Sequence, residues 1–129
     1  MDAPFRATHQ TKRMLYEMML CAEYRGAYVG YVRGEFSRTL TGFFQEVSSA
    51  FRFPYTFSWS WESLDACFRD LEWLSFSQLL WVISQPEKLF TQEEDHMAHV
   101  NALQRSIAAA ASFWRERQVP FDCVLNLFE

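Results

Sequence analysis

The feature that most constrains the fold is a run of five consecutive apolar residues, Leu79 to Ile83, with Pro86 close behind it. A strand with one exposed face alternates apolar and polar residues, whereas a strand that is covered on both faces is apolar throughout. We therefore expect a short central strand whose two faces are both covered by other elements.

Two further segments favour strands. Ala27 to Arg33 holds four β-favouring residues just before Gly34, and Cys123 to Phe128 (CVLNLF) is apolar except for one residue. Both are short enough to lie beside the run at Leu79 to Ile83 in one sheet.

The clearest amphipathic helix precedes the central strand. Phe53-Pro54 ends it, because a residue before proline is pushed out of the helical region. Ser37 and Thr39 are both placed to cap its start. Its apolar residues recur at i, i+3, i+4, i+7 and i+11, namely Leu40, Phe43, Phe44, Val47 and Phe51.

A second helix is predicted from Ser60, which can cap it. A third, long helix is predicted towards Arg117, with Thr91 and Glu94 in a capping-box pattern and Pro120 behind its end. In the second helix an apolar face holds Trp61, Leu64, Cys67 or Phe68, and Leu71, and a polar face holds Glu62, Asp65, Arg69 and Glu72.

Before the first strand, Thr11 to Arg25 has apolar residues at helical spacing, although a strand is an alternative there. From Ala27 onwards the order is β-α-α-β-α-β, which predicts right-handed helical crossovers. We expect an α/β protein with a small three-stranded parallel sheet, packed with about three to four helices in a single compact domain.

Length and composition are compatible with this fold. The chain has 129 residues, half of them hydrophobic, and it contains neither a stretch of about 18 apolar residues nor a secretion signal at its start. Its three cysteines, Cys21, Cys67 and Cys123, are widely spaced and odd in number, which is typical of buried free thiols. The expected location is the cytoplasm, with no membrane partner.

The formal net charge of −4 is unevenly distributed. Residues 53–99 carry eight acidic side chains and two basic ones, whereas the rest of the chain carries eight acidic and ten basic ones. An acidic middle argues against nucleic-acid binding and suits a basic partner, because complementary fields speed encounter. A solvated acidic face is the alternative interpretation.

The sequence offers no catalytic pattern. It has no Gly-rich phosphate loop, no nucleophile elbow and no HExxH. Asp95, His96 and His99 form the only metal-like cluster, and its position near the polar start of a helix argues against metal binding. We expect no enzymatic activity, no catalytic residue, no metal and no cofactor.

The central segment carries a family likeness. Phe51 to Leu74 reads FRFPYTFSWSWESLDACFRDLEWL, between a strand ending in Val32-Arg33-Gly34 and an apolar strand that is followed by a long helix and a last strand. This order resembles the barstar family of ribonuclease inhibitors over residues 27–129, which leaves residues 1–26 as an N-terminal extension. The residues in register with the family's apolar skeleton are Pro54, Phe57, Trp61, Leu64, Cys67 and Phe68.

Polar positions of the family pattern differ here. Glu62 takes the place of its first aspartate, Ser58 stands for a glycine and Ser60 for an asparagine. Ala66 stands where the family has the aspartate that fills the nuclease's phosphate-binding site. Asp65 is one residue earlier, and one step along a helix turns a side chain by about 100°.

The resemblance implies that the loop from Tyr55 to Ser60 and the exposed face of the second helix bind the target. Tyr55, Trp59 and Trp61 have packing in the core as an alternative role. Glu62 could instead only stabilise the first turn of the helix, and Asp65 and Arg69 could form an ordinary surface ion pair. The candidate partner-binding residues are Tyr55, Thr56, Trp59, Glu62, Asp65 and Arg69.

The implied function is that of a bacterial immunity or antitoxin protein that binds a basic ribonuclease toxin and occludes its active site. The first alternative is an immunity protein against a different toxin, and Ala66 favours it. The second is a small enzyme or structural subunit with the same core. Residues 1–26 could cover an exposed edge of the sheet or extend the toxin interface.

Overall fold

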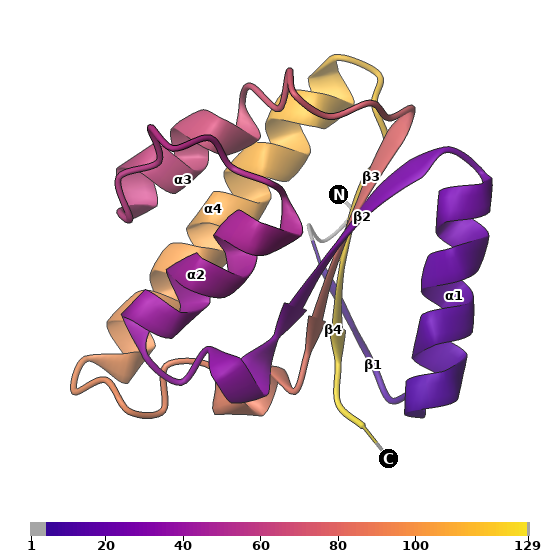
Figure 1. Ribbon diagram of the computed structural model, residues 1–129. Helices are drawn as coiled ribbons and strands as arrows, with labels where there is room; N and C mark the ends of the chain where they lie inside the picture. The colour runs from indigo at the N-terminus through magenta and orange to yellow at the C-terminus, as the bar shows by residue number, and fades with distance from the viewer. Residues whose placement is uncertain (1–4, 129) are drawn as a thin grey trace.

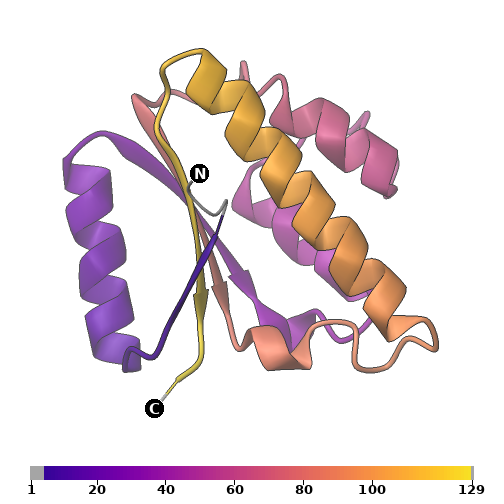
Figure 2. The same ribbon diagram turned by 180° about the vertical axis from the view of Figure 1, so that it is seen from behind.

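A computed structural model describes residues 5–128 as a four-stranded sheet with helices on both faces, as Figure 1 and the reverse view in Figure 2 show. Short 3₁₀ turns cover Gly34–Phe36 and Pro86–Lys88. The α/β class predicted from the sequence is confirmed. The elements are β1 (Arg6–Thr8), α1 (Lys12–Tyr24), β2 (Ala27–Arg33), α2 (Leu40–Ala50), α3 (Trp61–Phe68), β3 (Gln78–Ser84), α4 (His96–Glu116) and β4 (Phe121–Asn126).

The strands lie in the order β1-β4-β3-β2, and every neighbouring pair is parallel. From β2 the chain crosses to β3 through α2 and α3, and then to β4 through α4 (Figure 1). The connection from β1 through α1 to β2 crosses the whole sheet in the opposite direction. Crossovers of one hand that run in opposite directions place their helices on opposite faces. This explains why α1 alone covers the second face.

The prediction of three strands is wrong by one, because the N-terminal segment adds β1 beside β4. Thr8 pairs with the buried Asn126, whose Oδ1 accepts hydrogen bonds from the Thr8 hydroxyl and the Gln10 backbone N–H, both at 2.7 Å. Three residues without an apolar run give no strand signal in the sequence. The extension therefore covers the edge of β4, the first of the two roles considered for it.

The face under α2, α3 and α4 is packed with aromatic rings. The fully buried Trp81 of β3 stacks on Phe68 at 4.8 Å between ring centroids and meets Phe51 edge-on at 5.6 Å. Gly30 of β2 lies directly beneath the Phe51 ring, where any Cβ would collide with it. A glycine in this strand thus allows the phenyl ring to lie against the backbone.

The opposite face has a smaller cluster of aliphatic side chains. Leu15 and Ala22 of α1 pack on Leu80, Val82 and Val124 of the sheet. Together the two clusters cover both faces of β3, as the apolar run at Leu79 to Ile83 predicts.

The helix starts differ from the predictions in one case. Thr39 caps α2 and Ser60 caps α3 through side-chain hydrogen bonds to Gly42 N and Ser63 N. The predicted capping box of α4 is wrong, because that helix begins at His96 and the Thr91 hydroxyl donates to the Lys88 carbonyl instead.

Candidate partner-binding surface

The loop before α3 is anchored by one aromatic residue and leaves others in solvent. Phe57 is buried, meets Phe53 at 5.0 Å and Phe44 at 5.8 Å between ring centroids, and its N–H donates to the Pro54 carbonyl. Tyr55, in contrast, is 99% exposed. The chain thus fixes the loop through one ring and presents its neighbours outwards.

Trp59 has a backbone conformation that non-glycine residues seldom adopt. Its φ is +57°, its side chain is 47% exposed, and its ring stacks on Phe57 at 6.2 Å. Such a backbone conformation costs about 1–3 kcal/mol, and it is shared by Arg52, Leu71, Gln85, Phe90 and Gln118. Hydrogen bonds hold the junction, since Ser58 N–H donates to Ser63 Oγ and Ser63 N–H donates to Ser60 Oγ.

The exposed face of α3 carries three residues one turn apart. Glu62, Ala66 and Arg69 are exposed at i, i+4 and i+7, and helical geometry places them in one line. We call the loop Tyr55–Ser60 together with this line the α3 surface. The family aspartate is replaced by Ala66 in the middle of this line, so its centre lacks a carboxylate.

Asp65 lies on the flank of α3. Asp65 is half-buried, and its Oδ1 is shielded from solvent and has no hydrogen-bond partner among the described residues. The alternative interpretation paired Asp65 with Arg69, but no such ion pair occurs within residues 5–128. Glu62 also has no ion partner there. The charged side chains predicted to meet a partner are therefore not neutralised by one another.

Trp61, the first residue of α3, packs against the core. Its ring lies 5.5 Å from that of Phe43 and 5.3 Å from that of Phe44, and it stacks on His99 of α4. The indole N–H also faces His99 Nδ1 at 3.4 Å. Trp61 thus joins α3 to α2 and α4, the core role considered for it from the sequence.

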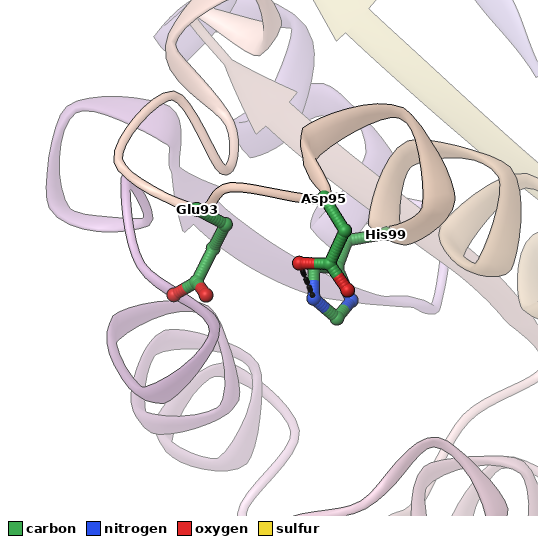
Figure 3. Close-up of side chains that lie close together, drawn as sticks. All are labelled: Glu93, Asp95 and His99. Carbon is green, nitrogen blue, oxygen red and sulfur yellow. Dashed lines mark ion pairs between the residues drawn. The ribbon is translucent and has the colours of Figure 1, made fainter.

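Figure 3 shows a polar cluster of Glu93, Asp95 and His99 at the start of α4. It lies next to Trp61, whose indole contacts His99. His99 Nε2 lies 3.2 Å from Asp95 Oδ1, and Glu93 Oε2 accepts a hydrogen bond from Leu40 N–H, at the start of α2, at 2.8 Å. One ligand atom from each of Glu93, Asp95 and His99 lies within 4.8 Å of the others. Glu93 was not predicted from the sequence, whereas His96 was predicted and is not part of the cluster.

The bonds of this cluster suit packing better than metal ligation. Both ring nitrogens of His99 already have partners, since the Trp61 indole N–H donates to Nδ1 at 3.4 Å and Nε2 lies 3.2 Å from Asp95 Oδ1. The cluster therefore ties together the starts of α2, α3 and α4 beneath the α3 surface.

Two of the three cysteines are buried. Burial raises the pKa of both the Cys67 and the Cys123 thiols, which keeps them protonated and weakly nucleophilic. Cys21 is exposed, so the expectation that all three thiols are buried is wrong for this one.

Comparison with known protein families assigns the chain to one of them. The family model for Barstar (barnase inhibitor) matches residues 27–126, from the start of β2 to the end of β4. The chain belongs to the barstar family. The match includes the whole α3 surface and begins after the predicted N-terminal extension. No curated protein matches the chain closely enough to count as a relative.

Membership of the barstar family indicates a broad functional class, that of ribonuclease inhibitors such as the inhibitor of barnase. Among the described residues, no helix is both long and apolar enough to cross a membrane. The partner-binding roles of Tyr55, Thr56, Trp59, Glu62, Asp65 and Arg69 stay predictions.

Proposed function

We propose that this chain is an immunity protein that binds a ribonuclease toxin and occludes its active site with the α3 surface. The observation that carries this proposal is Trp59, an exposed aromatic residue just before the charged line of α3, within the family-matched segment. Rigid aromatic residues are frequent anchors of tight interfaces. We place the protein in the cytoplasm of the cell that it protects.

The proposed mechanism is occlusion without chemistry. Trp59 and Tyr55 anchor in the nuclease cleft, and Thr56 contacts its rim. Glu62 and Asp65 pair with cationic side chains that would otherwise hold RNA phosphate, and Arg69 meets an acidic group at the edge. The lack of ion partners for Glu62 and Asp65 within residues 5–128 supports this, because no internal pair has to break on binding.

Ala66 supports a second candidate, an immunity protein against a toxin that is not a barnase-like ribonuclease. The residue lies at the centre of the exposed line on α3, where a carboxylate would be needed to mimic RNA phosphate. A barstar fold with this position neutral suits a target whose cleft has a different charge pattern.

We further propose that residues 1–26 are an addition to an inhibitor domain of residues 27–129. In support, β1 and α1 pack on the edge and the second face of the sheet, away from α3 (Figure 1).

Affinity capture from the native host with this chain as bait tests the proposal, followed by an RNA-cleavage assay of the captured protein. We expect a ribonuclease that is silenced by the wild-type chain and escapes from Glu62→Ala and Trp59→Ala. Glu87→Ala is the matched control, because Glu87 is exposed in the 3₁₀ turn Pro86–Lys88, outside the α3 surface. A captured toxin without RNA cleavage would favour the second candidate.

A further inference from the structure

The two edges of the sheet differ in how they are protected. At one edge β1 is only three residues long and carries Arg6, which pairs with Asp122 at 3.0 Å. At the other edge β2 is seven residues long, and no strand of the described chain pairs with its outer side. Short, charged edge strands prevent pairing with other chains, whereas long apolar ones invite it.

The backbone of β2 offers hydrogen-bonding groups at this free edge. Arg33 N–H points away from β3, since it donates to Glu46 Oε2 on α2 at 3.4 Å. Alternate residues of a strand point their backbone groups the same way, so the N–H groups of Val29 and Tyr31 also face outwards. No strand of the described chain pairs with them, so a monomer leaves these N–H groups to solvent.

A groove follows the free edge between α1 and α2. Near the C-terminal end of β2, a cavity of about 780 Å³ is lined by Tyr16 of α1, by Tyr31 and Arg33, and by Gln45, Glu46 and Ser49 of α2. Near the N-terminal end, a second cavity of about 380 Å³ is lined by Glu23, Tyr28 and Arg52. The open edge of β2 is thus flanked by α1 on one face of the sheet and by α2 on the other.

The side of α1 that borders this groove is apolar and exposed. Tyr16 is 45% exposed and meets Tyr31 edge-on at 6.1 Å, and Leu20, one turn further along α1, is 64% exposed. Large apolar side chains beside an unpaired strand are typical of an interface.

Charge complementarity favours one occupant, a second copy of this chain. One end of the groove carries Arg33 and Glu46, which form an ion pair at 2.7 Å, and the other end carries Glu23 and Arg52. When two β2 strands pair antiparallel about Gly30, each end meets the opposite end of the partner. The Arg33–Glu46 ion pair then lies beside the partner's Glu23 and Arg52, so that it extends into a network of four charges on both sides of a two-fold axis.

We propose that two copies of this chain associate through the free edges of β2, which pair antiparallel and join two four-stranded sheets into one. The outward N–H groups of Val29 and Tyr31 donate to carbonyl groups of the partner strand, and Tyr16 and Leu20 are buried against its α1. The α3 surface is not part of this edge, so a dimer can bind two toxin molecules.

Sedimentation equilibrium of the full chain tests this proposal at concentrations up to about 100 μM. We expect a reversible dimer for the wild type and a monomer for Val29→Pro, because proline removes an outward N–H that a monomer leaves in solvent. Glu23→Lys should raise the dimer dissociation constant at least about tenfold by placing a cation near Arg33 of the partner copy. Glu87→Lys changes the net charge equally at another place and should behave as the wild type.

Circular dichroism checks that each variant is folded. If Val29→Pro does not fold, the dimer dissociation constant of Glu23→Lys tests the proposal. A wild-type chain that stays monomeric up to the highest concentration would overturn the proposal. A dimer that Glu23→Lys leaves as stable as the wild type would overturn it equally, because the copies would then meet elsewhere.

Discussion

The two faces of the sheet solve the same packing problem with different side chains. Under α2, α3 and α4, large rings such as Phe51, Phe68 and Trp81 interlock, whereas under α1 the contacts are made by smaller residues such as Leu15 and Val82. Three helices are therefore held by one ring cluster, which fixes α3 as a rigid support for exposed charges. A single helix covers the other face and leaves the edge of β2 open.

The largest expected effect tests this difference directly. Phe68→Ala should lower the free energy of unfolding by about 3–5 kcal/mol, because its ring packs on both Trp81 and Phe51 and its loss leaves a cavity. Leu15→Ala should cost about 2–3 kcal/mol, since one helix can settle into the space left behind. Urea unfolding of both variants gives the two values. Equal losses would mean that the faces are equally rigid.

A smaller effect links packing to the α3 surface. Ser60→Ala should lower the free energy of unfolding by about 1 kcal/mol, because it removes the hydrogen bond from Ser63 N–H that caps α3 and also holds the turn at Trp59. Thr39→Ala removes the equivalent cap of α2 and should cost a similar amount. Calorimetric titration with the captured toxin measures the affinity of the two variants and distinguishes them. Only Ser60→Ala should weaken binding. An equal loss of affinity for Thr39→Ala would show that the effect on binding is not specific to the α3 surface.

Replacement of Asp65 should raise the stability of the protein and weaken its binding to the toxin. Its Oδ1 is shielded and without a partner in the described chain, so Asp65→Asn should raise the free energy of unfolding by up to about 1 kcal/mol while weakening toxin binding. Glu62→Gln, at an exposed position, should weaken binding with no change in the thermal midpoint. A stabilised Asp65→Asn with unchanged affinity would give Asp65 no part in the interface.

The smallest expected effect is a loss of stability at alkaline pH. Burial raises the pKa of Tyr28, on the aromatic face, and the pKa of Tyr31, on the α1 face, above the usual value of 10.0. The unfolded chain therefore loses these protons first, so stability is full below about pH 10 and falls as the pH rises through the folded-state pKa values.

Urea midpoints between about pH 8 and 11 measure this loss. Tyr28→Phe should reduce the alkaline slope, although it also removes the hydrogen bond from the Tyr28 hydroxyl to the Ala50 carbonyl at 2.7 Å. A slope that neither Tyr28→Phe nor Tyr31→Phe changes would assign the effect to other groups.

Most of the fold could be predicted from the sequence, because hydrophobic periodicity is a local signal. The pattern from Leu40 to Phe51 predicts α2, and the segment Ala27 to Arg33 predicts β2 with the same bounds. β1 could not be predicted, because three residues gain their strand conformation only from β4 and Asn126.

The site was less accessible to sequence reasoning. Family resemblance indicates the segment from Tyr55 to Arg69, and helical geometry turns Asp65 by about 100° from Ala66. No local pattern predicts that Asp65 Oδ1 is shielded from solvent without a hydrogen-bond partner in the described chain. The partnership of Glu93 with Leu40 N–H joins residues 53 apart in sequence, and only the folded chain brings them together. Such long-range contacts leave no periodic signal.

Titration of the captured ribonuclease with the wild-type chain, with RNA cleavage as the readout, tests whether the α3 surface occludes the active site. We expect that activity falls linearly and is abolished at one inhibitor chain per nuclease, and that preincubation with excess RNA slows inhibition. Full RNA cleavage by a nuclease that is saturated with the chain would contradict this expectation, because the α3 surface would then lie away from the active site.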